Sequence, residues 1–478
     1  MLSGQSSQFR PARWSAAVHP ISSSSPEEAA RFSVASFPLL FSSLRCIISD
    51  WKTSREKMLT IERAVPTVLS DDQEDSSAPR GCGRNCLGKC CMLVSELPLY
   101  AFKNDASPEV SPGADELPSD FFLNTLLLGQ WEDRMSRGLF RYDVAACETK
   151  VIPGKHGFVA LLNEGRHLKK RPTEFRVVDR VLQPFDPAKF NFTKVGQEEV
   201  LFRFEAGGKD HKSQFLERSA VADETESPSV VAINVSPIEY GHVLLVPHVL
   251  DCLPQRIDPE SLSLALHMAA EAGSPYFRVG YNSLGAFATI NHLHFQAYFL
   301  STPLPVEKAH ARKIPIESRV KFSKLVDYPV RGLVYERGRS TLKELSDTVA
   351  RSCIWLQEND TPFNVLISDC GRRIFLFPQC YAEKQALGQV SQELLDTQVN
   401  PAAWEISGHM VLKRKKDFEQ ASEDYAWRLL AEVSLSEARF EEVVKACMHV
   451  CGHAMGLAES EEIAAVEKND LRMISPLH

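Results

Sequence analysis

The chain has 478 residues, 44% of them hydrophobic and 24% charged, with a formal net charge of −8 at pH 7. This composition is typical of a globular protein with two or three domains, or with one large core built from two similar halves. The acidic balance argues against nucleic acid as a partner, and the lack of any run of about 20 apolar residues argues against a membrane span.

Residues 1–57 form a Ser-rich segment that contains Arg10 and Arg13 but no acidic residue before Glu27. That composition is typical of an organelle transit peptide. The alternative is an N-terminal extension without regular structure, because Met58 opens a plausible start of its own and acidic residues from Glu27 onward dilute the transit signature. We expect a cytoplasmic protein, also nuclear if the basic run at 169–171 is read as a signal, with organelle targeting left open.

Residues 58–119 are rich in Ser, Pro, Gly and Asp and lack sustained periodicity, which predicts a loop-rich segment. It contains GCGRNCLGKCC, with the cysteines Cys82, Cys86, Cys90 and Cys91. Structural zinc sites use close cysteine pairs with a second pair some distance away, so this spacing favours a flexible or lipidated segment over a metal site. The chain's 12 cysteines accompany no plausible secretory signal, which favours reduced thiols.

The folded part is expected to begin at residue 120 with the helix-like run DFFLNTLLLGQWEDRM. A hairpin is predicted in SVVAINVSPIEYGHVLLVPH, where two apolar runs flank a Gly-containing turn. The helix that follows has Asp258 as its N-cap and Pro259 at its first position. Two further strands, YFRVGYNS and INHLHFQAYFL, complete this pattern.

A weaker copy of the pattern recurs at 361–385, where Asn364 and Pro378 echo Asn234 and Pro247 of the first hairpin. A helix is predicted over 419–448 from its apolar stripe. The sequence thus predicts an α+β fold with a first half at 120–330, a second, degenerate half at 331–456 and a charged tail at 457–478. Only the first half contains a His-x-His-x-Gln motif.

That motif, NHLHFQ, places His292, His294 and Gln296 at every second position. On a strand these side chains share one face, about 6.5 to 7 Å apart, while Leu293 and Phe295 point into the core. A central imidazole with polar neighbours can attack phosphorus and carry a nucleotidyl group covalently. A glutamine amide can hold phosphoryl oxygens without titrating, which suits cleavage of a nucleoside diphosphate linkage.

Two other interpretations of NHLHFQ stay open on spacing alone. Paired histidines on one strand face are good zinc ligands, and His242, His248 or His409 could complete such a site. The second alternative is an ordinary polar strand face without chemistry.

The hairpin NVSPIEYGHVLLVPH followed by NHLHFQ resembles the histidine triad superfamily, whose members bind a nucleotide between a hairpin and the histidine strand. Glutamine at the third triad position resembles the transferase branch, which includes galactose-1-phosphate uridylyltransferase. The likeness is closer still to plant GDP-sugar phosphorylases of ascorbate biosynthesis, through GCGRNCLGKCC, LPLYAFK, RGLFRYDVAACETKVIPG, VLQPFDPAKFNFTKV and PAAWEISGHMVLKRKKDFE, and extends from Met58 to about Gly456.

The resemblance implies two histidine-triad-like halves with antiparallel sheets and packed helices, of which only the first is catalytic. It implies that His294 is the nucleophile that carries GMP, flanked by His292 and Gln296. Asn234 stands where the superfamily usually has a ribose-binding acid, so the residue type departs from the pattern. We expect nucleotide contacts from Asn234 and from two residues that precede the triad strand, Asn282 and Ser283.

The implied reaction converts GDP-L-galactose and inorganic phosphate to L-galactose 1-phosphate and GDP. Arg278 or the basic run at 169–171 could hold the anionic acceptor. No cofactor is expected and no metal ligand is assigned, while metal dependence and oligomeric state stay open. The alternatives are a related nucleotidyltransferase or hydrolase, and a regulatory protein that binds a nucleotide without turnover.

Overall fold

The computed structural model describes residues 97–103, 122–164, 166, 179–207, 213–216 and 227–452. All of them belong to one of the two units into which the chain divides, Asp75–His478. The predictions for the segment 1–57, the cysteines at 82–91, the basic run at 169–171 and the tail at 457–478 lie outside the described residues.

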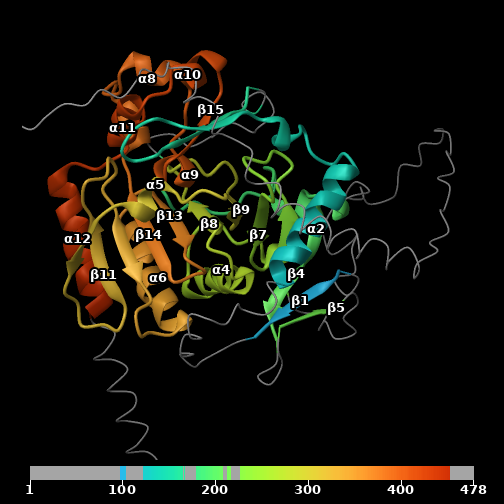
Figure 1. Cartoon of the computed structure of the whole chain (residues 1–478). Coiled ribbons are helices and arrows are strands. Elements are labelled where there is room, and N and C mark those ends of the chain that lie inside the picture. Colours follow the sequence, from blue (N-terminus) through green and yellow to red (C-terminus); the bar gives the residue numbers. More distant parts are fainter. Residues whose placement is uncertain are drawn as a thin grey trace, which may run out of the picture. The chain divides into compact units, whose positions relative to one another are not determined.

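Two sheets organise the described residues (Figure 1). The larger has 12 strands, which follow one another across the sheet as β10 (Ala311–Ile314), β11 (Lys321–Leu325), β12 (Leu333–Glu336), β14 (Arg373–Pro378), β13 (Phe363–Ser368), β8 (Phe277–Asn282), β9 (Phe295–Phe299), β7 (Val243–Val246), β6 (Val230–Ile233), β4 (Val200–Ala206), β1 (Leu99–Phe102) and β5 (Gln214–Leu216). The smaller has β15 (His409–Leu412), β3 (Val159–Leu162) and β2 (Thr149–Val151).

The helices fall into two groups. The longer ones are α2 (Phe122–Ser136), α4 (Pro259–Ala272), α6 (Leu342–Glu358) and α12 (Glu437–Gly452). The shorter ones are α5 (Pro305–Lys308), α7 (Tyr381–Ala386), α8 (Gln392–Asp396), α9 (Ala403–Ile406), α10 (Lys415–Glu419) and α11 (Glu423–Ala431). None in the described part of the chain is long and apolar enough to cross a membrane.

Most strand pairs are antiparallel, but the prediction of antiparallel sheets throughout is wrong. β1 pairs with β4 in parallel at one end of the large sheet, and β15 pairs with β3 in parallel in the small one. In both cases the two strands lie far apart in the chain, so their direction is set by the elements between them and not by a hairpin turn.

The middle of the large sheet has a symmetric strand order. The four strands on one side, β11, β12, β14 and β13, correspond in order to β6, β7, β9 and β8 on the other. Each inner pair follows a long helix in the chain: α6 precedes β13–β14, and α4 precedes β8–β9. The segment 361–385 therefore corresponds to the β8–β9 pair. The prediction that Asn364 corresponds to Asn234 is therefore wrong. Any hairpin of two apolar strands around a Gly-containing turn has this sequence pattern, but the position of a hairpin in the sheet depends on the strands with which it pairs.

Strand alternation separates two apolar cores on the two faces of the large sheet. Tyr281, Phe295 and Val365 face the core that α2, α4, α6 and α12 cover. Tyr298 and Leu366 face the other core, which includes residues of α9, α11 and the small sheet. Figure 1 shows the long helices α12, α6 and α4 apart from the group formed by α8, α10, α11 and β15.

Two helices test the sequence analysis in detail. α4 is confirmed: Asp258 is its N-cap and accepts the N–H of Ser261, with proline at its first position. The single helix expected over 419–448 is wrong, because α11 and α12 are separate. Ser434 breaks it, since its hydroxyl donates to the carbonyl of Pro329, accepts the N–H of Arg331 and lies in a segment that bridges to Gln379.

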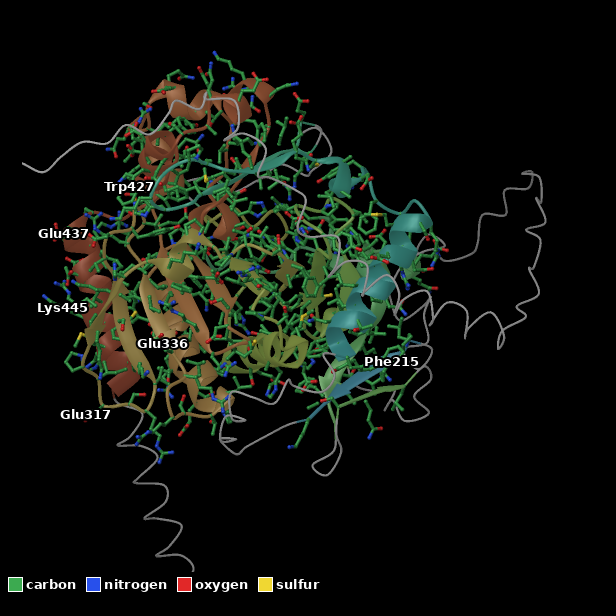
Figure 2. The ribbon with its side chains drawn as sticks, viewed as in Figure 1. Phe215, Glu317, Glu336, Trp427, Glu437 and Lys445 are labelled. Carbon is green, nitrogen blue, oxygen red and sulfur yellow. The ribbon has the colours of Figure 1, made fainter. Side chains whose placement is uncertain are left out.

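α12 shows why its sequence forms a surface helix. Val443, Val444 and Cys447 are buried against the long-helix core. Glu437 and Lys445 are exposed, and Figure 2 shows both at the outer margin of the molecule's α12 side. This division between an apolar and a charged face is the pattern from which such helices are predicted.

Candidate active site

The two histidines of NHLHFQ lie immediately before β9, because that strand begins at Phe295. The prediction that one strand carries the whole motif is therefore wrong. Leu293 and Phe295 do face the long-helix core, as alternation predicts. His292 and His294 are only 0% and 6% exposed, so they are not part of an ordinary solvent-facing strand surface.

The side chain of Gln255 explains why strand pairing stops at the motif. Gly280 of β8 pairs with Gln296 of β9, so Asn282 falls opposite His294 two residues further on. The Gln255 carboxamide lies between them: Oε1 accepts the His294 N–H at 2.9 Å, and Nε2 donates to the carbonyls of His294 (3.2 Å) and Asn282 (2.9 Å). A buried amide thus replaces strand hydrogen bonds and fixes the backbone of His294.

The imidazole of His294 has a defined tautomer. Its Nδ1 lies 2.8 Å from the carbonyl oxygen of His292. A carbonyl oxygen only accepts, so Nδ1 carries the hydrogen and the neutral ring has its lone pair at Nε2. The ring of Phe192 packs beside it, with 4.9 Å between ring centroids. Nε2 of His294 is therefore a candidate nucleophile.

His292 has the opposite tautomer. Its Nδ1 accepts the backbone N–H of Phe192 at 3.0 Å, which leaves the hydrogen on Nε2. Burial, and then the neighbouring His294, lower the pKa of His292 to about 4, so the ring is neutral at pH 7. Nε2 is buried and makes no hydrogen bond of good geometry within the described residues, although an interaction with the backbone of Val249 acts to raise the pKa of this ring. The ring of Phe185 meets this imidazole edge-on at 5.4 Å.

Gln296, on β9, is oriented by a residue far away in the chain. The indole Nε1 of Trp404, on α9, donates to Gln296 Oε1 at 3.4 Å. The amide nitrogen of Gln296 is then the group left to meet a ligand. Phosphoryl oxygens are acceptors, so this orientation suits a phosphate group.

Asn282 ends β8 and Ser283 follows it, and the two residues have different surroundings. Oδ1 of Asn282 accepts from Asn364 Nδ2 (2.7 Å) and from the Ala403 N–H (2.9 Å), which again directs the amide nitrogen away from these partners. The hydroxyl of Ser283 is 0% exposed; it donates to its neighbour's carbonyl and accepts the Phe363 N–H. The geometry favours Asn282 over Ser283 for contact with a ligand.

Asn234 lies just after β6 and belongs to a separate group. Its Oδ1 accepts the Ser236 N–H at 3.0 Å, and its Nδ2 lies 3.2 Å from Nε2 of His242. The structure therefore links His292, His294, Gln296 and Asn282 through shared partners, whereas Asn234 is linked to the hairpin.

The described residues do not support the zinc alternative. Within 97–103, 122–164, 166, 179–207, 213–216 and 227–452, no group of three or more His, Cys, Asp or Glu could hold a metal ion. The three histidines considered as further ligands contact other groups: His242 the N–H of Ile238, His248 the carbonyl of Ser227 and His409 the hydroxyl of Tyr298.

Arg278 does not hold the acceptor, contrary to one suggestion from the sequence. The guanidinium is 1% exposed and forms a bidentate pair with Glu307 at 2.9 and 2.8 Å. Its remaining nitrogen donates to the carbonyls of Tyr276 and Leu300. All its nitrogens thus meet protein acceptors.

A second buried group of titratable residues lies beside Trp404. The Tyr298 hydroxyl is 2.7 Å from Nδ1 of His409, whose Nε2 is 3.9 Å from Glu239. Burial, with a contribution from Arg278, lowers the pKa of His409 to about 4. Burial raises the pKa of Glu239 to about 7. At neutral pH the imidazole is uncharged, so this contact is not an ion pair.

Comparisons with known proteins place the chain in a family. The family model described as "GDPGP1-like, N-terminal domain" matches residues 122–298, and "GDPGP1-like, C-terminal domain" matches 305–454. The chain is 66% identical over 412 residues to GDP-L-galactose phosphorylase 1 of Arabidopsis thaliana, which covers 85% of this chain and 91% of the relative. This chain belongs to the GDPGP1-like family.

More distant proteins are also similar to this GDPGP1-like chain. GDP-D-glucose phosphorylase 1 of Homo sapiens is 34% identical over 352 residues, covering 70% of this chain and 86% of the relative. The crystal structure of yeast Ap4A phosphorylase Apa2 has a TM-score of 0.45 and 14% identity, covering 66% of this chain and 99% of that one. The latter likeness is too distant to bear on function.

Three residues of the candidate site escaped the sequence analysis: Gln255, Phe192 and Trp404. Phe192 and Trp404 lie in VLQPFDPAKFNFTKV and PAAWEISGHMVLKRKKDFE, two stretches that carried the family resemblance, so a signal for them was present. Gln255 had none, because a single glutamine after a hairpin is usually a solvated loop residue.

Proposed function

We propose that this chain is a GDP-L-galactose phosphorylase, which transfers a guanylyl group from GDP-L-galactose to inorganic phosphate and releases L-galactose 1-phosphate and GDP. The substrate is supported by the 66% and 67% identity to the two Arabidopsis thaliana proteins of that name. The chemistry is carried by one observation: the Nδ1–H of His294 is held by the His292 carbonyl, which presents the lone pair of Nε2.

In the first step, Nε2 of His294 attacks the phosphorus nearest guanosine. The bond from this phosphorus to the bridging oxygen breaks, and L-galactose 1-phosphate leaves as an anion that needs no proton donor. The guanylylated ring retains the hydrogen on Nδ1 and gains positive charge, which the His292 carbonyl at 2.8 Å stabilises. In the second step, an oxygen of inorganic phosphate attacks the same phosphorus, the phosphorus–nitrogen bond breaks, and GDP forms.

The neighbours of His294 act as neutral donors. The Nε2–H of His292 and the amide nitrogens of Gln296 and Asn282 bind phosphoryl oxygens or the ribose. The low pKa of His292, about 4, keeps this donor uncharged at the pH of the reaction. Asn234 completes the proposed nucleotide-binding set at the ribose. Ser283 supports this set through the backbone, because its buried hydroxyl donates to the Leu284 carbonyl and accepts the Phe363 N–H.

The proposed architecture has two histidine-triad-like halves, of which only the first has the catalytic motif. We propose a boundary before β11 (Lys321–Leu325) and not at 330/331, because β11 corresponds to β6 in the strand order. The symmetric order of the eight central strands in the described sheet supports this proposal. Two halves in one chain supply the pairing that small proteins obtain by dimerising. We propose a cytoplasmic location, with nuclear entry and organelle targeting by residues 1–57 left as alternatives.

Intact-mass analysis tests the reaction. The purified chain is mixed with GDP-L-galactose in phosphate-free buffer, beside a His294→Ala sample and a control in which the exposed His310 is changed to alanine. We expect wild type and His310→Ala to gain one GMP mass, which added phosphate discharges as GDP, and His294→Ala to gain nothing. Turnover by His294→Ala at the wild-type rate would remove His294 as the nucleophile.

The hexose needs its own measurement, because relatives with 34% identity are named for GDP-D-glucose. GDP-L-galactose and GDP-D-glucose are supplied together in excess, and the hexose 1-phosphates that are released are quantified. We expect L-galactose 1-phosphate to dominate. A preference for GDP-D-glucose would keep the guanylyl-histidine mechanism and change the assigned substrate.

A further inference from the structure

α9, from the second half of the chain, contacts two amides of the candidate active site. The N–H of Ala403 donates to Oδ1 of Asn282 at 2.9 Å. The next residue, Trp404, donates its indole Nε1–H to Oε1 of Gln296 at 3.4 Å. One short helix thus holds the oxygen end of both carboxamides.

The chemistry of the indole makes the second contact selective. A carboxamide has a donor end and an acceptor end of nearly the same shape, so Gln296 could turn by half a rotation with little change in packing. The Trp404 indole nitrogen is only a donor, and a turned amide would place N–H groups against it. The contact is long for a hydrogen bond, yet it needs only to make the turned state less favourable.

Trp404 is itself fixed by close packing. It is 1% exposed, and its ring lies 4.0 Å from that of Tyr298 between centroids. Gly280 makes room for it on β8: a Cβ there would lie 3.0 Å from Cζ2 of the indole. Gly280 is also the residue directly opposite Gln296 in the strand pair. The indole is therefore confined beside the amide it meets.

We propose that Trp404 is a positioning residue for guanylyl transfer, which holds Gln296 with its amide nitrogen directed at the transferred phosphoryl group. This inference rests on the proposed function. The second half of the chain then contributes to the chemistry of the first without a reacting atom of its own.

The substitution Trp404→Phe tests the proposal, because it removes the indole N–H and keeps an aromatic ring beside Tyr298. We expect the single-turnover rate of guanylyl-His294 formation to fall roughly three- to tenfold, the effect of losing one hydrogen bond, with KM changed less than twofold. Trp131→Phe is the matched control, since Trp131 is also buried and donates its Nε1–H to a carbonyl, that of His242, at 3.2 Å. We expect its rate to stay that of wild type.

A double-mutant cycle separates positioning from general packing. In a Gln296→Ala background, Trp404→Phe should have no further effect on the rate, because the amide it orients is gone. The same rate loss in both backgrounds, or no loss in wild type, would overturn the proposal. If wild type itself gains no GMP adduct, the proposed function fails, and that failure is visible before any variant is compared.

A second replacement keeps the test valid if Trp404→Phe does not fold. Benzothienylalanine at position 404 retains the two-ring shape and replaces the N–H by sulfur. Near-ultraviolet circular dichroism and the unfolding midpoint establish that the protein is folded. A folded protein with this residue and an unchanged rate of adduct formation would overturn the proposal, whereas the expected three- to tenfold loss would support it.

Discussion

The hairpins β8–β9 and β13–β14 occupy corresponding places in the symmetric sheet but end differently. β13 and β14 are joined by residues 369–372, with positive φ at Asp369, Cys370 and Gly371. A Cβ on Gly371 would lie 2.8 Å from the carbonyl oxygen of Leu266, so the turn packs tightly on α4. β8 and β9 are instead separated by residues 283–294, which contain both histidines. The same strand pair thus supports either a tight turn or a reactive segment.

The comparison also shows what the second half does. Asn282 on β8 and Asn364 on β13 lie opposite each other where the halves meet. Asn364 is 0% exposed and donates to Asn282, while Gln379 donates to Asn364. The chain of amides runs from the second half toward the candidate site in the first. The half without the motif therefore supports the half that has it.

The largest expected effect comes from replacing the side-chain amide of Gln255, which lies between His294 and Asn282 where the pairing of β8 and β9 stops. Gln255→Glu keeps the shape and the acceptor of the His294 N–H but turns a carboxylate oxygen toward the carbonyls of His294 and Asn282. We expect kcat to fall about a hundredfold at pH 7, as for loss of two buried hydrogen bonds. The introduced carboxyl group can donate again once it is protonated, so the ratio of variant to wild-type rate should rise as the pH falls.

Gln357→Glu is the matched control for this substitution. Gln357 makes the same two-way contact with the backbone of Ile257, accepting at 2.6 Å and donating at 3.0 Å, without touching the nucleophile. We expect it to lower stability but to leave the pH dependence of the rate unchanged. A pH-dependent recovery in both variants would mean that the recovery does not report on His294.

A smaller effect is expected from breaking the contact between the halves. Asn364→Asp replaces the nitrogen that donates to Asn282 Oδ1 (2.7 Å) and to the Ala286 carbonyl (2.9 Å) with an oxygen. We expect KM for GDP-L-galactose to rise about tenfold and the unfolding free energy to fall by about 2 kcal/mol. Asn359→Asp, at an exposed amide that donates only to the Trp355 carbonyl, should leave KM unchanged and lower the unfolding free energy by less, because water solvates the introduced carboxylate. An unchanged KM in Asn364→Asp would separate the second half from nucleotide binding.

The sequence predicted those features that depend on neighbours in the chain. The β6–β7 hairpin and α4, with Asp258 and Pro259 at its start, are confirmed because alternation and capping are local. The start of β9 was wrong because Gln255, far from it in the chain, takes the hydrogen bonds of His294. The likeness of 361–385 to β6–β7 was misplaced for a related reason, since the strand order depends on how the halves join.

Trp404 shows the same limit at the candidate site. The residue types of NHLHFQ indicated a nucleophile with two flanking groups, and the structure places them beside one another before and on β9. The orientation of Gln296 depends on an indole from the other half of the chain. The sequence around either residue does not indicate that Trp404 contacts Gln296.

The smallest expected effect compares one buried imidazole from each half, His292 and His409. Burial lowers the pKa of both to about 4, whereas in the unfolded chain both imidazoles have a pKa of about 6.5. Between these values the unfolded chain binds the protons and the folded one does not, so stability is lost as the pH falls from about 6.5 toward 4. Glu239 acts in the opposite direction, since its folded pKa of about 7 makes the folded state bind a proton first.

Removing that carboxyl should therefore expose the full acid sensitivity of the two histidines. Glu239→Gln does not titrate, so its unfolding free energy should fall by about 1 to 2 kcal/mol more than that of wild type between pH 7 and pH 5. Urea unfolding at the two pH values measures this difference. An equal decrease in both proteins would mean that Glu239 is ionised when folded. The contact at 3.9 Å between Glu239 and His409 would then be an ion pair below neutral pH. The pKa of His409 would in that case not be lowered as that of His292 is.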